Sequence, residues 1–243
     1  MRPLCIVSVL VVSLLSAPAS AQVVTPENPS LTTDDSANEK LLAEGIALLR
    51  GRKPEEAISG YFDRVIASYE ARHRDSSGLV YGARSQAEVL FYLIQAATER
   101  KSAVAIGSTW GDALYLKAYA LVEVRRLDEA KEALRQALRL SPKNAQYQSE
   151  LGQIYSYEKN WNKAMEAYQL AASAAEEFSP PVMKISEVTR AWRGMAYVDV
   201  ELGRLVEAEE LYKKCLALNP ADRAASGELG LVQSLRAQQR PKP

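Results

Sequence analysis

Side chains suited to catalysis are scarce in this sequence. The 243 residues include one histidine, His73, and two cysteines, Cys5 and Cys215. Acid–base or nucleophilic chemistry needs a base, a nucleophile and an orienting group within reach of one another. His73 stands between Arg72 and Arg74 in "EARHRD", without a recognisable partner constellation. We therefore assign it to a solvated helix face.

Other candidate motifs are equally weak. The segment "GSTWGD", which begins at Gly107, lacks the G-x-S-x-G pattern of a nucleophile elbow. The adjacent acids Glu176–Glu177 and Glu209–Glu210 match ordinary exposed helix residues better than a catalytic pair. The sequence offers no phosphate-cradling glycine-rich loop. We predict no enzymatic activity, no catalytic residue and no cofactor.

The N-terminal segment predicts export. Arg2 precedes an apolar run over residues 4–15, and "APASA" over residues 17–21 supplies a small-residue cleavage pattern. This organisation is typical of a secretory signal peptide, and the run is short for a membrane span. We expect cleavage after residue 21, a periplasmic or secreted product, and no integral membrane span in that product.

Charge and cysteine content exclude several classes of partner and of stabilising site. Loss of Arg2 with the signal leaves 29 basic residues against 30 acidic ones, a net charge of −1. A near-neutral chain without a basic stripe argues against nucleic acid as a partner. Cys5 leaves with the signal as well, so no internal disulfide can form. One cysteine and one histidine are too few for structural zinc. We expect Cys215 to be a buried core thiol.

Two segments of the chain repeat one another. "VEVRRLDEAKEALRQALRLSP" over 122–142 matches "VELGRLVEAEELYKKCLALNP" over 200–220. In a 34-residue numbering, units begin at Gly111, Ala145 and Thr189. Small residues recur at positions 8, 20 and 27, and mostly larger apolar residues recur at positions 4, 7, 11, 17 and 24. Such a pattern predicts helix pairs that bury their faces by stacking on one another.

The unit over 145–178 carries L-G-x2-Y followed by A-x3-Y, and the unit over 189–222 carries A-x3-Y and a late proline. These motifs resemble the tetratricopeptide repeat (TPR), a helix–turn–helix unit. The resemblance implies an all-α, right-handed superhelix of stacked repeats, an α–α solenoid. Lys117 and Asp199 depart from the family pattern, standing where a leucine and an aromatic residue are usual.

The repeat register divides the whole chain. We predict a signal peptide over 1–21, a flexible linker over 22–37, a degenerate TPR-like repeat over 38–71, an extra helix with a connector over 72–110, TPR units over 111–144 and 145–178, a connector over 179–188, a TPR unit over 189–222, and a capping helix with a tail over 223–243.

Within 72–110, an apolar stripe favours one buried helix over a degenerate repeat, and "SAVAIGS" over 102–108 predicts a tight connector. The stripe consists of Val89, Leu90, Leu93, Ile94 and Ala97.

The resemblance also implies a binding surface. First helices of TPR units line a concave groove, and the matching positions here hold Tyr115, Tyr119, Glu150, Gln153, Tyr157, Arg190, Arg193 and Tyr197. Tyrosine combines a flat apolar face with a polar tip and is favoured at protein interfaces. An alternative is that Tyr115 and Tyr119 pack against the helix around residues 89–97.

The carboxylate clamp of chaperone-binding TPR relatives is absent, because its positions hold Tyr115, Tyr119, Glu150, Arg190 and Gly194. Arg190 and Arg193 remain candidates to pair with an acidic partner.

These observations predict an exported interaction module or adaptor of the periplasm or cell envelope that binds a protein or peptide partner in its concave groove. Two alternatives belong to other classes. One is a self-associating structural subunit of an envelope assembly. The other is a glycan-binding protein that uses its tyrosines as stacking platforms.

Overall fold

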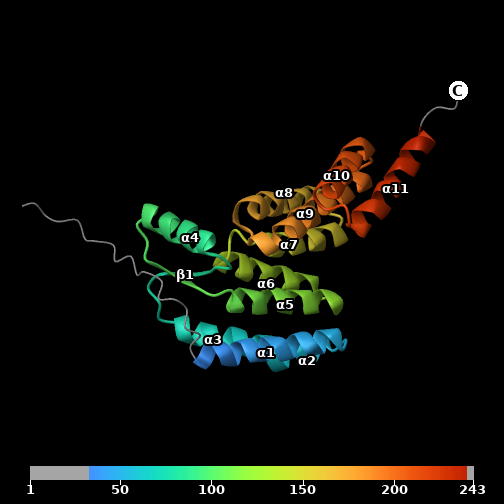
Figure 1. Cartoon of the computed structure of the whole chain (residues 1–243). Coiled ribbons are helices and arrows are strands. Elements are labelled where there is room, and N and C mark those ends of the chain that lie inside the picture. The colour runs from blue at the N-terminus through green and yellow to red at the C-terminus, as the bar shows by residue number, and fades with distance from the viewer. Residues whose placement is uncertain (1–32, 240–243) are drawn as a thin grey trace, which may run out of the picture.

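The computed structural model describes residues 33–239, so the predicted signal peptide lies outside the described residues. Helices in antiparallel pairs dominate the structure (Figure 1). They are α1 (Thr33–Arg50), α2 (Pro54–Ala57), the π-helical turn η1 (Ile58–Phe62), α3 (Asp63–His73), α4 (Gln86–Thr98), α5 (Thr109–Glu123), α6 (Leu127–Leu140), α7 (Ala145–Tyr157), α8 (Trp161–Phe178), α9 (Pro181–Glu201), α10 (Leu205–Leu218) and α11 (Arg223–Gln239). The predicted all-α repeat fold is confirmed.

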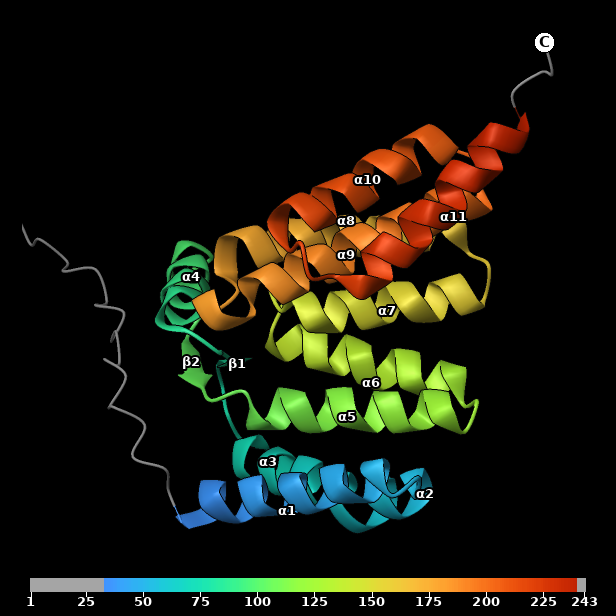
Figure 2. The ribbon, with the colours of Figure 1, turned by 45° about the vertical axis from the view of Figure 1, so that its right-hand side comes forward.

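The first helices of successive pairs run in the same direction through the stack. In Figure 2, α5, α7 and α9 run from left to right, and α6, α8 and α10 return beside them. The C-terminal ends of α5, α7 and α9 therefore lie at the same edge of the stack. Figure 2 also shows α1 beneath α5 and α11 at the opposite end.

A recurring turn joins the two helices of each pair. One residue in each turn adopts the left-handed conformation: Arg52, Arg125, Lys159 or Gly203, with φ of 57°, 63°, 57° and 75°. A left-handed residue after the last helical turn ends a helix and lets the chain reverse. Side chains cap the N-termini of α4 and α7. Ser85 accepts a hydrogen bond from the backbone N–H of Glu88 at 3.2 Å, and Asn144 accepts one from the backbone N–H of Gln146 at 3.0 Å.

Small residues hold the pairs close together. Position 20 of the repeat holds Ala57, Ala130, Ala164 and Ala208, all fully buried. Tyr168 of α8 fills the space beside two glycines of neighbouring helices. A Cβ on Gly152 would lie 2.9 Å from the Tyr168 ring, and a Cβ on Gly194 would lie 2.3 Å from it. Glycine at these two positions therefore permits the close approach of α7 and α9 to α8.

The region between α3 and α5 differs from its prediction. Strand β1 (Leu79–Gly82), helix α4 and strand β2 (Ala103–Ile106) form a β–α–β unit with a parallel two-stranded sheet. Leu79 pairs with Ala103 and Gly82 with Ile106. The predicted tight connector over 102–108 is wrong, since its centre is a strand. The short run "AVAI" suits a strand, but its partner lies more than twenty residues earlier, beyond the reach of local periodicity.

The predicted apolar stripe of α4 is also wrong. Leu90 is 62% exposed and Ile94 is 56% exposed, whereas the buried side is formed by Glu88, Tyr92 and Ala96. The predicted stripe and the observed buried stripe both fit helical spacing. The sheet and Phe178 cover α4 on one side, and the ring centroid of Phe178 lies 4.7 Å from that of Phe91. The buried stripe includes a glutamate, so hydrophobicity alone selects the opposite face.

Two predicted boundaries move. The connector over 179–188 is mostly helix, because α9 begins at Pro181, a residue that suits the first helical position. The additional residues lengthen α8 and α9 to 18 and 21 residues. Residues 33–37 of the predicted linker begin α1, and the remainder of that linker lies outside the described residues. At the other end, the predicted capping helix is α11, and its Leu229, Val232 and Leu235 pack on the last repeat.

Candidate interaction face

Three tyrosines reach solvent from three consecutive first helices. Tyr119 of α5 is 41% exposed, Tyr157 of α7 is 56% exposed and Tyr197 of α9 is 42% exposed. Gln153, one turn before Tyr157, donates to the Tyr157 hydroxyl at 2.7 Å. The ring of Tyr197 meets Trp161 edge-on, with centroids 6.2 Å apart. We call Tyr119, Tyr157 and Tyr197 the tyrosine row.

The other predicted groove residues support this row from within. Tyr115 is half-buried and stacks on Tyr147 of α7, with ring centroids 5.5 Å apart. Its ring neighbour is thus in α7 and not in α4, against the alternative packing. Glu150 is buried, and its carboxylate lies 2.5 Å from a guanidinium nitrogen of Arg190. Burial, followed by the Glu150 charge, raises the pKa of Tyr115. This layer joins α5, α7 and α9.

The two arginines proposed as contacts for an acidic partner already have carboxylates. Arg190 pairs with Glu150, and Arg193 pairs with Asp222, whose other oxygen accepts from the backbone N–H of Ala225 at 3.0 Å. Both carboxylate side chains are more than 90% buried. Releasing either arginine would leave a buried unpaired charge, which is costly. The prediction that these arginines pair with an acidic partner is therefore replaced by internal pairing.

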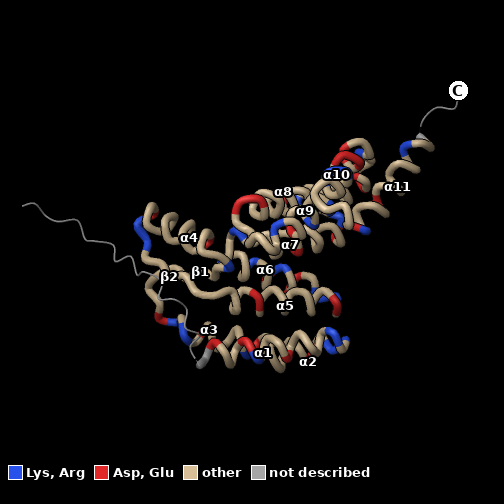
Figure 3. The backbone as a smooth tube through the Cα atoms, viewed as in Figure 1, with Lys and Arg blue, Asp and Glu red and all other residues tan. Residues whose placement is uncertain are grey.

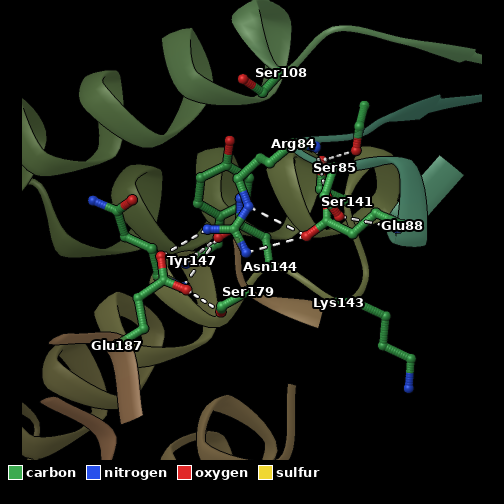
Figure 4. Close-up of polar contacts among 12 residues, drawn as sticks. Arg84, Ser85, Glu88, Ser108, Ser141, Lys143, Asn144, Tyr147, Ser179 and Glu187 are labelled. Atoms are coloured by element: carbon green, nitrogen blue, oxygen red, sulfur yellow. Dashed lines mark hydrogen bonds and ion pairs between the residues drawn. The ribbon is translucent and has the colours of Figure 1, made fainter. Parts of the chain in front are cut away.

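A second polar cluster fixes the β–α–β unit to the C-terminal repeats (Figure 4). Arg84 follows β1, and its Nη1 lies 2.7 Å from the Glu187 carboxylate of α9. Its Nη2 lies 3.1 Å from Glu88, which also accepts from the Arg84 backbone N–H at 2.6 Å. Ser179 donates to the second oxygen of Glu187. All three charged side chains are at most 8% exposed, and burial raises the pKa of Glu88.

This cluster of Arg84, Glu88, Ser179 and Glu187 was not predictable from the sequence. Arg84 and Glu187 are 103 residues apart, and neither stands at a repeat position with a defined role. The capping serine Ser85 with Glu88 three residues later was a local signal for the start of α4, but it does not identify the distant partner.

The side chains of His73 and Cys215 pack against neighbouring groups of the fold. His73 stacks on Trp110 with centroids 5.7 Å apart, and Trp110 stacks on Tyr69 at the same separation. The solvated face predicted for His73 is thus wrong, because its ring packs between helices, and burial lowers its pKa. Cys215 is fully buried as predicted, and burial raises the pKa of its thiol to about 11.

Metal-binding geometry is also lacking in the described part of the chain. Over residues 33–239, no group of three or more His, Cys, Asp or Glu side chains is arranged to hold a metal ion.

Comparisons with known proteins agree with the repeat architecture. Family models described as the tetratricopeptide repeat match residues 115–180 and 189–222. The chain is a tetratricopeptide repeat protein. The second match has the same limits as the last TPR unit marked out from the sequence. Tetratricopeptide repeats form protein–protein interaction modules, so the matches support an interaction module in this chain.

Solved TPR structures share the fold at low identity. PilF of Pseudomonas aeruginosa superposes with a TM-score of 0.58 and 15% identity, over 85% of this chain and 72% of that one. MamA of Desulfovibrio magneticus RS-1 superposes with a TM-score of 0.51 and 16% identity, over 82% of this chain and 85% of that one.

Among curated proteins, the RNA polymerase-associated protein CTR9 of Caenorhabditis elegans is 24% identical over 116 residues, which are 47% of this TPR chain and 9% of CTR9. The chain thus spans a small fraction of that relative. No helix between residues 33 and 239 has the length and apolar character needed to cross a membrane.

Proposed function

We propose that this TPR protein is exported and binds a protein or peptide partner across the tyrosine row. The observation that carries the proposal is the exposure of three tyrosines, from 41% to 56%, on three consecutive first helices. The signal-like pattern over residues 1–21 supports export.

The row suits macromolecular recognition for a physical reason. A tyrosine contributes a large contact area and one hydroxyl while having only two side-chain torsions to order. The backbones that carry the rings are held by the Arg190–Glu150 pair and the Tyr115–Tyr147 stack beneath them. A rigid platform loses little conformational freedom on binding, so more of the contact energy appears as affinity.

A capture experiment tests the proposal. Purified wild-type protein and the variant Tyr119→Ala/Tyr157→Ala/Tyr197→Ala are crosslinked in an envelope extract of the producing cells, after circular dichroism shows that both fold. The matched control is Leu170→Ala/Val206→Ala, which removes exposed apolar surface from the second helices α8 and α10. We expect a captured protein that the control retains and the triple variant loses. Equal capture by both variants would contradict the proposal.

Export is tested separately by N-terminal sequencing of the protein recovered from cells. A mature chain that begins at Gln22 is expected, and an intact Met1 or Arg2 terminus on the recovered protein would contradict export by this signal.

A further inference from the structure

A glutamate lies near each end of the tyrosine row. Glu123 is the last residue of α5, four positions after Tyr119, and Glu201 is the last residue of α9, four positions after Tyr197. Both are exposed. Within the described residues, neither has a Lys or Arg nitrogen within 4 Å, whereas many other acids of the chain do. Figure 3 shows acidic and basic residues interspersed along the helices, so these unpaired acids do not simply reflect a uniformly acidic chain.

The local backbone also favours a cation at this edge. The C-terminal end of a helix carries partial negative charge from its unsatisfied carbonyl groups. The ends of α5, α7 and α9 lie together at one edge of the stack (Figure 2), and two of them terminate in a carboxylate. Negative side chains are disfavoured there, so their placement has no stabilising role within the helix itself. A bound cation would relieve this repulsion.

The two arginines at the predicted groove positions do not pair with these carboxylates. Arg190 and Arg193 are held by the buried carboxylates of Glu150 and Asp222. The pKa values of Tyr119 and Tyr197 also reflect the negative charge of these glutamates. After burial, the Glu123 charge is the largest cause that raises the pKa of Tyr119, and the Glu201 charge has the same rank for Tyr197.

The rings themselves are available to a cation. Elsewhere in the fold, Arg72 lies 5.0 Å from the centroid of the Tyr69 ring and Lys163 lies 5.6 Å from that of Tyr155. Within the described residues, no Lys or Arg covers a ring of the tyrosine row. An uncovered aromatic face attracts Lys or Arg through its quadrupole, and the flanking carboxylates can form ion pairs with the same side chains.

We propose that the partner segment recognised by the tyrosine row is a basic peptide, whose Lys or Arg side chains lie over the rings of the row and pair with Glu123 and Glu201. This inference rests on the proposed function, because it assumes that the row is the binding surface.

Binding of defined peptide pools tests the inference. Three pools of fluorescein-labelled nonapeptides carry Arg, Gln or Glu at alternate positions and the same random apolar or aromatic mixture between them. Fluorescence anisotropy is measured with wild type, Glu123→Gln/Glu201→Gln and the triple tyrosine variant. The matched control is Glu207→Gln/Glu210→Gln, which removes two exposed carboxylates from α10. Chitohexaose, read out by calorimetry, serves as a non-peptide probe.

We expect the Arg pool to bind tightest to wild type and to weaken as salt is raised. Loss of both carboxylates should weaken that binding by about 3- to 10-fold, since exposed ion pairs are individually modest. The α10 control should bind like wild type, and the triple tyrosine variant should lose binding. Equal effects of the two glutamate pairs would overturn the inference.

The remaining outcomes separate the inference from the proposed function. Tyrosine-dependent preference for the Gln or Glu pool would overturn the basic-peptide inference and leave the proposed function standing. Tyrosine-dependent binding of chitohexaose without binding of any peptide pool would overturn both and favour glycan recognition. Absence of binding to every probe would also overturn both.

Discussion

The guanidinium of Arg84 lies 2.7 Å from the carboxylate of Glu187, although the two residues are 103 positions apart. Arg84 belongs to the β–α–β unit and Glu187 to the helix that carries Arg190, Arg193 and Tyr197. The unit inserted before α5 is therefore joined to the helix that completes the tyrosine row. We treat it as part of the scaffold rather than as an appendage.

Replacing Arg84 alone should be severe. Arg84→Met leaves the carboxylates of Glu88 and Glu187 buried without their cation, and breaking a buried pair in this way costs about 3–5 kcal/mol. Urea unfolding at pH 7 measures the loss. The variant Arg84→Met/Glu88→Gln/Glu187→Gln removes the charges together and should recover most of it. Extrapolation from urea carries an error of about 1 kcal/mol. A free energy of unfolding for Arg84→Met that lies within that margin of the wild-type value would contradict the structural role.

Acid should partly rescue the same variant. Burial already raises the pKa of Glu88 in the native protein, and loss of the Arg84 charge raises it further. A carboxyl whose folded-state pKa lies above its unfolded value favours folding below the unfolded value and loses that contribution as pH rises through the folded value. The stability gap between Arg84→Met and wild type should therefore narrow from pH 7 toward pH 4. A gap that is constant with pH would contradict this assignment.

Gly194 should tolerate no side chain. Its added Cβ would lie 2.3 Å from the ring of Tyr168, so Gly194→Ala should destabilise the protein by about 1–3 kcal/mol through overpacking. Gly227→Ala in α11 is the control, because nothing lies within 4 Å of its added Cβ. Alanine there should stabilise the helix by about 0.5–1 kcal/mol. Equal effects of the two variants in thermal unfolding would refute the packing argument.

Glu209 should stabilise the docking of α11 in a pH-dependent way. Its carboxylate pairs with Lys213 at 2.7 Å and with Arg236 of α11, and these hydrogen bonds lower its pKa to about 2. A lowered folded-state pKa gives stability that is complete above the unfolded value of about 4.3 and disappears as pH falls through the folded value. The Tm of Glu209→Gln should lie below that of wild type at pH 6, and the difference should shrink steadily below about pH 4 and disappear as pH falls through about 2. A Tm difference that stays constant between pH 6 and pH 2.5 would contradict the assignment.

Cys215 should report on unfolding. Its thiol is fully buried, donates to the Thr189 carbonyl at 3.6 Å and has a pKa raised to about 11. In a Cys5→Ser background at pH 8, a disulfide reagent should modify native Cys215 about 100-fold or more slowly than an exposed thiol, because the thiolate is scarce and shielded. The rate in concentrated urea is the control. Rapid reaction of the native protein would show that the last repeat opens readily.

The repeat core was predictable from sequence because the same contacts recur in each unit. Ala130, Ala164 and Ala208 stand at one repeat position and occupy one structural position, at the close approach of two helices. Cys215 could be placed in the core by the same register. A helix start also has a local signal where a proline suits the first helical turn, as at Pro54.

Features that depend on distant partners were not predictable. The face that α4 buries is decided by Arg84, whose guanidinium pairs with Glu88 of α4 and with Glu187 of α9. The pairing of β2 with β1 likewise joins segments separated by a helix. Arg190 and Arg193 stand at groove positions that suggest free side chains. Their carboxylate partners, Glu150 of α7 and Asp222 just before α11, are distant in sequence, so the internal pairing could not be predicted.

Site-specific photo-crosslinking tests the central claim most directly, namely that the tyrosine row is the binding surface. A photoreactive phenylalanine analogue replaces Tyr157 in one variant and Val206 of α10 in another, both of which are at least half exposed. After irradiation in the producing cells, we predict a covalent adduct of one defined partner protein at position 157 and none at position 206. The same adduct at both positions, or an adduct at position 206 alone, would contradict the claim.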